Sequence, residues 1–523
     1  RWRDRRRPRG GNPGAMIVTL PAGLGLVADQ AAHDAPDGAW SLISNMRFVD
    51  GYAERCKGHL AVLTTPSAAP YHVVRYQVGS TVFWVHATLT GAFADDATTK
   101  TDISGTAFTG DADDTFTSCV LGGVLCLNNG KDVPVFWGGD TGSNYATLTG
   151  WDSDWRCKSL RSFKYYLLAL NVTKTATNYG SMVKWSHAAP AGSIPSSWDE
   201  TDATLDAGEI DLAETSDTII DGLPMGDTFV VYKDHSTYGL QYIGGNDIFR
   251  QFRLPGDHGM MARNCVVQTP MGHVVLTLSD MVIHNGTGPT SVLDGRARRW
   301  MFNRIDTANY RRSFLVHNPA LKEVWACYPT VGESACTEAA IWNYKENTVG
   351  VRALPNVTHG TFGPIISSAT DIWDGDTETW DEDETPWSQS PVSEADNRLI
   401  MSSTAPEMYL MDQTGQFDGT SYTASLERTG LALGDQSTVK LVRRVIPRID
   451  AAAGTVLSIQ VGGAMDAETA PSYSAAVSYT VGSSYKADTF ASGRFIALRI
   501  SSAGNASWRL KSLDLDVVQM GRF

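Results

Sequence analysis

Short apolar segments that alternate with polar positions run through most of the chain, and turn-forming residues separate them. The segments are rich in β-branched and aromatic residues, which favours strands over helices. One short helix is predicted at residues 305–314, with Asp306 or Thr307 as its N-cap. The pattern therefore predicts an all-β protein. The clearest predicted strands are residues 72–78, 81–87, 123–127, 165–170, 229–233, 273–278 and 323–328.

These strands recur as hairpin-like units at a nearly regular interval. Most successive units begin about 43 to 51 residues apart, and two longer gaps each contain an insertion, at about residues 188–215 and 369–397. A four-stranded propeller blade takes about 40 to 50 residues. The interval predicts a β-propeller platform of about six blades over residues 16–420, with inserted loops. Two stacked β-sandwiches would give a similar pattern and stay open as the alternative.

Both ends of the chain depart from this interval. Residues 421–523 contain longer alternating strands, which predict a C-terminal, antiparallel β-sandwich-like domain. Residues 1–15 are rich in Arg, Gly and Pro and have no periodicity, so they predict a basic N-terminal arm or extension. Residues 16–28 have the outline of a signal peptide. Pro21 interrupts their apolar core, which favours a natural start at Met16 instead.

The charge balance indicates which kinds of partner the protein can bind. The chain of 523 residues has 43 Lys and Arg against 57 Asp and Glu, a net charge of −14. Six of the first nine residues are Arg, so the body is more acidic still. Because gripping nucleic acid requires a basic footprint, such a body disfavours stable DNA binding. It allows DNA to pass by without adhering. No apolar run approaches the roughly 20 residues that a membrane span needs.

The sequence offers no convincing motif for catalysis, a cofactor or a metal. Residues 23–28 match a dinucleotide-binding glycine pattern, but no amphipathic helix follows, so a glycine turn is predicted. The Gly130-Lys131 pair lacks the rest of a phosphate loop and fits a hairpin turn better. His273 and His284 are predicted to be packed or surface residues, since no His/Cys cluster occurs. We therefore predict no catalytic residue, no cofactor and no metal site, and a protein that is not an enzyme.

Seven cysteines without a CxxC motif do not suggest a disulfide framework. We expect buried free thiols and folding in a reducing compartment. A bond between Cys327 and Cys336 across a hairpin is the open alternative.

The most unusual stretch is residues 371–384, which contains eight acids. Trp373, Trp380 and Trp387 recur in and just after it at a fixed interval. Dense carboxylates could bind calcium, although the spacing of an EF-hand is absent. We favour a loop whose Trp rings anchor it to the body, with its acids facing water or a channel.

Several stretches resemble tail nozzle, or tail hub, proteins of short-tailed bacteriophages (podoviruses), the tail tubular protein B-like family. The first is residues 44–55, with an Asn-x-Arg core at Asn45 and Arg47, followed by Lys57-Gly58. The resemblance runs in order over nearly the whole body. The further stretches are residues 223–233, 240–245, 280–286, 296–299, 317–319, 322–325, 328–329, 340–344, 373–387 and 492–494.

The resemblance implies a structural virion protein with a β-propeller platform and a β-rich tip. Six copies would form the nozzle that continues the DNA ejection channel below the portal and its adaptor, the head-to-tail connector. Tail fibres or spikes would dock outside, and viral double-stranded DNA would pass through transiently. The expected location is the virion tail, assembled in the host cytoplasm. No catalytic residue is carried over, because the family's pattern contains none.

Two other functions fit the same sequence. One is a glycan-binding or glycan-degrading β-propeller protein of the virion, in which Trp373 and Trp380 stack on sugar rings and an acid pair supplies catalysis. The other is a purely structural head or baseplate component.

Overall fold

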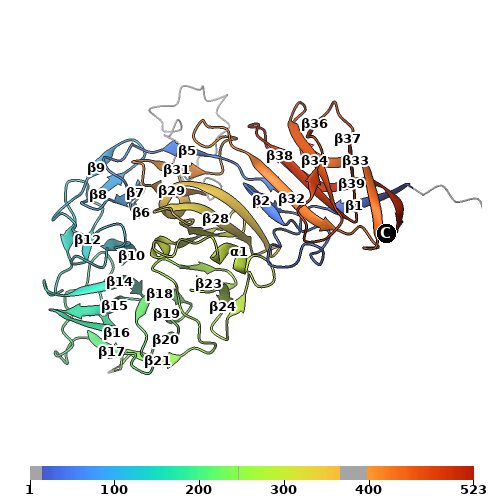
Figure 1. The fold of residues 1–523 in the computed structure, drawn as a ribbon. Helices are drawn as coiled ribbons and strands as arrows, with labels where there is room; N and C mark the ends of the chain where they lie inside the picture. The colour runs from blue at the N-terminus through green and yellow to red at the C-terminus, as the bar shows by residue number, and fades with distance from the viewer. Residues whose placement is uncertain (1–14, 80, 246, 366–396, 523) are drawn as a thin grey trace, which may run out of the picture.

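The computed structural model describes residues 15–79, 81–245, 247–365 and 397–522 (Figure 1). Nearly all of its regular structure is antiparallel β-sheet. The predicted arm at residues 1–15 and the acidic insertion at residues 369–397 lie outside the described residues, apart from Ala15 and Asn397.

Five consecutive four-stranded sheets form most of a ring, coloured blue to green in Figure 1. Each is a meander in which neighbouring strands are consecutive in the sequence. They are β6 (His72–Val78), β7 (Thr81–Ala87), β8 (Ala92–Asp95) and β9 (Lys100–Asp102); β10 (Thr117–Leu121), β11 (Val124–Asn128), β12 (Val135–Trp137) and β13 (Ala146–Thr147); β14 (Arg156–Phe163), β15 (Tyr166–Lys174), β16 (Thr177–Trp185) and β17 (Gly208–Asp211); β18 (Ile219–Met225), β19 (Thr228–Lys233), β20 (Thr237–Tyr242) and β21 (Phe249–Arg253); β22 (Val266–Thr269), β23 (Gly272–Leu276), β24 (Met281–His284) and β25 (Thr290–Ser291).

Two further sheets complete the ring by sharing one long strand, β29. Its first part pairs with β28 in the sixth sheet, and its second part pairs with β30 in the seventh. The outermost strand of the seventh sheet, β5, comes from near the N-terminus and pairs with β31. The strands are β26 (Phe314–Asn318), β27 (Glu323–Tyr328), β28 (Cys336–Asn343), β29 (Thr348–Pro364), β30 (Asn397–Ser403), β31 (Met408–Met411) and β5 (His59–Val62).

The innermost strands contact one another around the ring. β10 contacts β14, β14 contacts β18, and the series continues through β22 and β26 to β29, which contacts β6. This arrangement is a β-propeller, so the predicted all-β propeller is confirmed. The described residues form seven blades where about six were expected, because β29 and β5 build a last blade from distant parts of the chain.

The C-terminal strands form two packed sheets beside the propeller (Figure 1), as the predicted sandwich requires. Strands from the N-terminal segment join both sheets. β1 pairs with β39 and β2 pairs with β32, so pairing crosses the boundary predicted between residues 420 and 421. One sheet contains β1 (Ala15–Pro21), β39 (Trp508–Arg522), β33 (Thr438–Ala451) and β37 (Ala487–Gly493); the other contains β2 (Leu42–Ser44), β32 (Ala424–Leu431), β38 (Phe495–Ser502), β34 (Val456–Ala464), β35 (Ser472–Tyr473) and β36 (Val477–Thr480).

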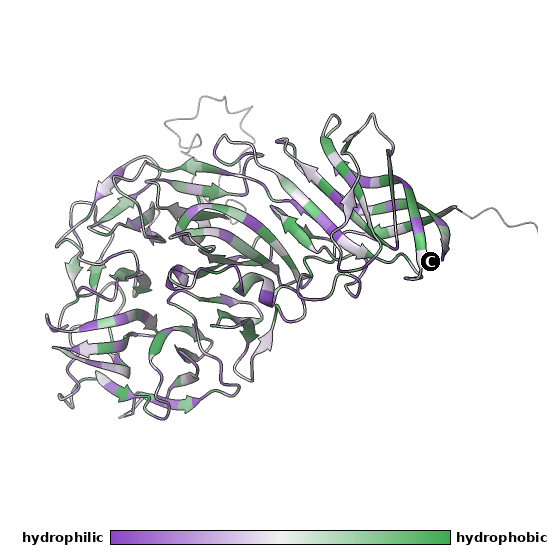
Figure 2. Cartoon of the chain, viewed as in Figure 1, coloured by the Kyte–Doolittle hydropathy of each residue, from purple (hydrophilic) through white to green (hydrophobic). Residues whose placement is uncertain are grey.

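A hairpin of β3 (Met46–Val49) and β4 (Tyr52–Arg55) joins propeller and sandwich. β3 bridges to β29, and β4 pairs with β39. Apolar side chains concentrate on the strands (Figure 2), and one buried cluster runs from the fifth and sixth blades through this hairpin into the sandwich. The two parts therefore share a core and do not meet only at a surface.

The predicted helix at residues 305–314 is wrong. The described helical segments nearby are α1 (Arg298–Phe302) and the 3-10 turn η1 (Tyr310–Arg312). Ile305 instead forms a β-bridge with Thr330, which holds the segment against the β27–β28 hairpin. The Asp306 carboxylate does accept hydrogen bonds from the Ala308 and Asn309 backbone N–H groups, but it caps a turn and no α-helix follows.

Candidate functional site

The stretch that carries the resemblance, residues 44–55, lies at the joint between propeller and sandwich. Asn45 has a φ of 53°, a left-handed conformation that Asn tolerates better than most residues. Its side-chain amide donates to the Thr423 carbonyl at 2.9 Å, and its oxygen accepts from the Ala353 N–H at 2.9 Å. The Asn in the motif thus links the sandwich segment before β32 to β29.

Buried charges surround the next residue of the motif. The Arg47 guanidinium lies 3.2 Å from Glu54 and 3.0 Å from Asp412, and Arg352 lies 2.7 Å from the other oxygen of Asp412. The Arg47 and Arg352 side chains are 3% and 0% exposed. Glu323 lies 3.9 Å from Arg47, and burial raises the pKa of Glu323 to about 7. Opposite charges hold four strands, β3, β4, β27 and β29, and the loop after β31 together here.

Arg55 has a matching structural role on the other side of β4. It donates to the carbonyls of Ala506 and Gly415, at 3.2 Å each, and its guanidinium lies 4.0 Å from the centre of the Tyr422 ring. Such cation–π packing stabilises a buried guanidinium. The residues of the motif therefore connect structural elements, and their arrangement does not suggest catalysis.

A polar network occupies the centre of the propeller. Arg161 on β14 donates to Asp221 on β18 at 2.8 Å and to the Asn264 side-chain oxygen at 3.0 Å. It also donates to the Ser118 carbonyl, while the Ser118 hydroxyl lies 2.8 Å from His72 on β6. Burial and the neighbouring Arg161 change the Asp221 pKa in opposite directions, and the pKa is lowered overall. The network ties several blades together around a paired charge.

Five cations gather at the end of the propeller where β14, β22 and β26 begin. None of them has a carboxylate partner within 4.0 Å among the described residues. The Arg263 guanidinium donates to the carbonyls of Asn129 and Lys158, at 3.0 and 2.8 Å, and Arg156 donates to the Lys131 carbonyl at 2.9 Å. We call this set the basic cluster: Lys131, Arg156, Lys158, Arg263 and Arg311.

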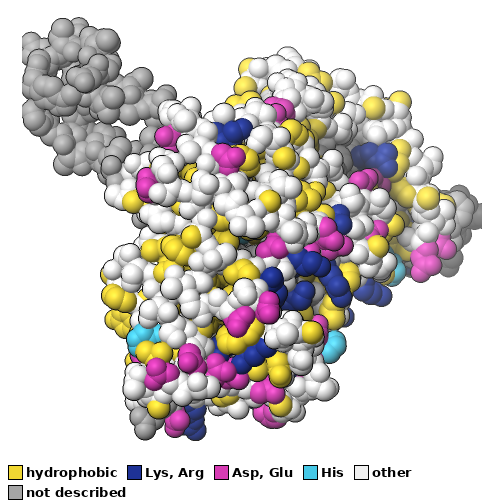
Figure 3. Space-filling view, turned by 90° about the vertical axis from the view of Figure 1, so that its left-hand side faces the viewer, with side chains coloured by type: hydrophobic (Ala, Val, Ile, Leu, Met, Phe, Trp, Pro, Cys, Tyr) yellow, Lys and Arg dark blue, Asp and Glu magenta, His cyan; other side chains and the backbone are white. Residues whose placement is uncertain are grey.

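No described ion pair involves the basic cluster, although Asp114 lies close enough to raise the pKa of Lys158 and Arg263. Partial burial lowers the pKa of Lys158, and the nearby charge of Arg263 lowers it further. Asp114 raises it, and Lys131 and Arg311 have smaller lowering effects. On the left-hand side of the molecule, Figure 3 shows Lys and Arg side chains interspersed with Asp and Glu, most of them near the middle of that face. Positive charge is thus concentrated on a chain whose net charge is −14.

Histidines also cluster, contrary to their scattered positions in the sequence. His273 and His284 both lie within hydrogen-bonding distance of the Tyr232 hydroxyl, at 2.7 and 2.6 Å. His258 packs against His284 with a ring-centre separation of 4.6 Å. Burial lowers the pKa of His258 and of His273 to about 4. His273 and His284 are packed residues, as predicted.

The glycine-rich stretches form turns. A side chain at Gly23 would meet the Gly51 carbonyl oxygen at 2.4 Å, so this glycine permits a close backbone approach. Gly130 has a φ of +77°, in a turn where the Asn129 side chain accepts from the Lys131 and Asp132 N–H groups. Among the strands described, β11 and β12 are joined by this longer turn and not by a two-residue hairpin.

All seven cysteines are free thiols, and six are buried. Cys327 faces Ala339 on β28, while Cys336 faces Val357, so the open alternative of a bond between Cys327 and Cys336 is wrong. Cys119 and Cys126 do face each other across β10 and β11.

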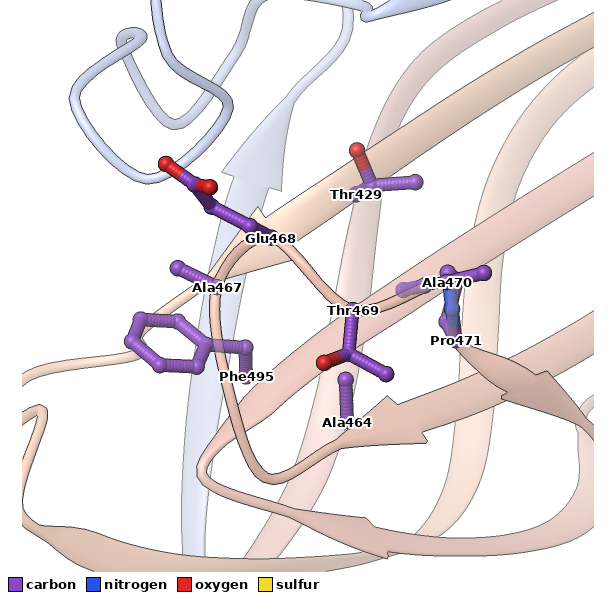
Figure 4. Close-up of a pocket in the computed structure, with 10 residues that line it drawn as sticks. Thr429, Ala464, Ala467, Glu468, Thr469, Ala470, Pro471 and Phe495 are labelled. Carbon is purple, nitrogen blue, oxygen red and sulfur yellow. The ribbon is translucent and has the colours of Figure 1, made fainter.

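Two hollows occur in the sandwich, far in sequence from the basic cluster. One has a volume of about 210 Å³ and includes a single ionisable side chain, Glu468, on the loop after Ala464 (Figure 4). The other, of about 600 Å³, is lined by hydroxyl and amide side chains that include Ser458, Ser501 and Asn505. Neither brings together a nucleophile and a base.

Within the described ranges, no three His, Cys, Asp or Glu side chains are placed to hold a metal ion. No helix in that part of the chain has the length and apolarity of a membrane span.

No family model matches the chain, and no curated protein matches it. Solved structures do match. YCF48 from Cyanidioschyzon merolae is 8% identical over 68% of this chain and 98% of its own, with a TM-score of 0.36. The WD40 domain of Toxoplasma gondii coronin is 9% identical over 73% and 87%, also with a TM-score of 0.36. The WD40 β-propeller domain of Doa1 is 12% identical over 68% and 97%, again at 0.36. These scores are too low to indicate a function.

Proposed function

We propose that the chain is a structural virion protein, a subunit of the homohexameric nozzle of a short phage tail. In this role six copies continue the DNA ejection channel below the portal and adaptor, and their outer surfaces dock fibres or spikes. The protein has no catalytic activity and needs no cofactor or metal. Its location is the virion tail, after assembly in the host cytoplasm.

One observation carries the proposal. The ordered resemblance implies a propeller platform with a β-rich tip, and the chain folds into a propeller joined to a sandwich. The first stretch of the resemblance, around Asn45 and Arg47, occupies the joint between them. The net charge of −14 also suits a wall past which DNA must move without adhering.

Electron microscopy of tail complexes that contain this chain tests the proposal. We expect a closed ring of six copies, because cyclic closure is the common solution for like subunits that enclose an axis. Imaging within the tail is required because the adaptor can act as the template for the ring. Any symmetry other than six-fold, or a position outside the tail, would reject the proposal.

The hydroxyl-lined hollow around Ser458, Ser501 and Asn505 supports a second candidate, a glycan-binding or glycan-degrading protein. We expect no turnover when the pure protein is mixed with bacterial polysaccharides, and no binding on a glycan array. Turnover that disappears when a specific acid pair is mutated would favour the enzyme. Binding that is lost in Asn505→Ala would favour a lectin.

A further inference from the structure

The basic cluster is assembled from separate loops. Lys131 lies between β11 and β12, Arg156 and Lys158 lie at the start of β14, and the connections before β22 and β26 supply Arg263 and Arg311. Like charges brought together repel, so the arrangement costs free energy until an anion covers it. Arg263 is fixed by its bonds to the Asn129 and Lys158 carbonyls, so the cluster is held in place.

The form of the cluster indicates a protein partner. Lys131, Lys158 and Arg311 are exposed, and the two hollows described above lie elsewhere, in the sandwich. Small ligands prefer concave sites, so an open surface is a poor site for one. Duplex DNA needs a long basic footprint, and the net charge of −14 repels it. A protein surface that carries carboxylates is therefore the partner that best matches the charge of the basic cluster.

The chain itself carries such a surface on the outer edge of the third blade. Residues 199–214 include the last part of the loop after β16, the edge strand β17 and the three residues that follow it, and they contain seven acids. Glu200 and Glu209 are paired with Lys184, but Asp199, Asp202 and Asp211 are exposed and have no cation partner among the described residues. We call residues 199–214 the acidic edge.

We propose that the basic cluster of one copy binds the acidic edge of a second copy. Because the two surfaces differ, two copies joined by one contact still have one free basic cluster and one free acidic edge. Such head-to-tail contacts build a ring when the rotation between copies closes, and an open filament when it does not. The inference rests on the proposed function, for which it supplies a contact between neighbouring subunits.

Sedimentation velocity of the full chain over a range of concentrations tests the contact. At an ionic strength of about 0.05 M we expect self-association, which weakens at about 0.5 M because salt screens surface charge. The double variant Lys158→Glu/Arg311→Glu should weaken association at least about tenfold, and so should Asp199→Lys/Asp202→Lys. Combining both pairs of substitutions in one chain should restore association. A matched control, Lys486→Glu, alters an exposed ion pair with Asp488 in the sandwich and should change nothing.

Circular dichroism of each variant checks folding, and Lys158→Gln/Arg311→Gln provides a milder form of the same test. A chain that stays monomeric at low salt, or association that the charge reversals leave unchanged, overturns the contact. Binding of a 20-base-pair DNA duplex that the Lys158 and Arg311 variants abolish would replace the protein partner with nucleic acid. Failure of the contact leaves six-fold tails possible, whereas tails without six-fold symmetry refute the proposed function even if copies associate.

Discussion

Asp412→Asn will lower the free energy of unfolding by about 3–5 kcal/mol, because it removes the carboxylate shared by two buried guanidinium groups. Arg47 and Arg352 lie 3.0 and 2.7 Å from its two oxygens, and neither side chain can reach water easily. Of these two guanidinium groups, the remaining acids Glu54 and Glu323 contact only that of Arg47. Asn is the suitable replacement because residue 412 has a φ of 62°, which Asn tolerates. Urea unfolding at neutral pH, followed by circular dichroism, measures the loss.

Asp488→Asn is the matched control. Asp488 pairs with Lys486 on the surface, where both side chains are largely exposed, so its loss should cost less than about 1 kcal/mol. If Asp412→Asn costs no more than this control, the joint does not depend on its buried charges. The arrangement around Asp412 would then be incidental to stability.

Acidification from pH 6.5 to pH 4 will destabilise the protein steeply. Burial lowers the pKa of His258 and His273 to about 4 and that of His284 to about 3, from an ordinary value of 6.5. Above pH 6.5 these rings are neutral in both folded and unfolded chains, so they contribute no pH dependence. Below it the unfolded chain binds protons that the folded chain does not. Each such ring then costs about 1.4 kcal/mol per pH unit until its folded pKa is reached.

The thermal midpoint between pH 7 and pH 4 measures this effect. His258→Phe keeps an aromatic ring beside Tyr232 and removes one titrating group, so its midpoint should fall less steeply with pH. His235→Phe is the control, because His235 is exposed and should leave the slope unchanged. Equal slopes for all three proteins would contradict a role for the buried rings.

Local pattern was sufficient for strand type and spacing in the propeller. The ranges predicted at residues 72–78, 81–87 and 323–328 coincide with β6, β7 and β27. Periodicity identifies a strand and its buried face, but it does not identify the strand with which it pairs. That is why the platform was predicted to include residues 16–21 and 42–44, although β1 and β2 pair with β39 and β32 of the sandwich.

The polar sites were harder still to foresee. Arg161 and Asp221 are 60 positions apart, and nothing in either local pattern indicates that they pair. The basic cluster draws residues from positions 131 to 311, within a chain whose total charge is negative, so no local window reveals it. In contrast, the stretch around Asn45 and Arg47 could be recognised because its residues are contiguous in the sequence.

The closing of the last blade by β5 has a consequence for synthesis on the ribosome. β5 ends at Val62, but its partner β31 begins at Met408. At about 5–20 residues per second, roughly 20 to 70 seconds separate the two segments as the nascent chain emerges. Throughout that time the ring stays open, and an unpaired strand edge is prone to non-native pairing. We infer that growing chains of this protein need protection by chaperones until β31 is made, and that prematurely terminated chains cannot close the ring.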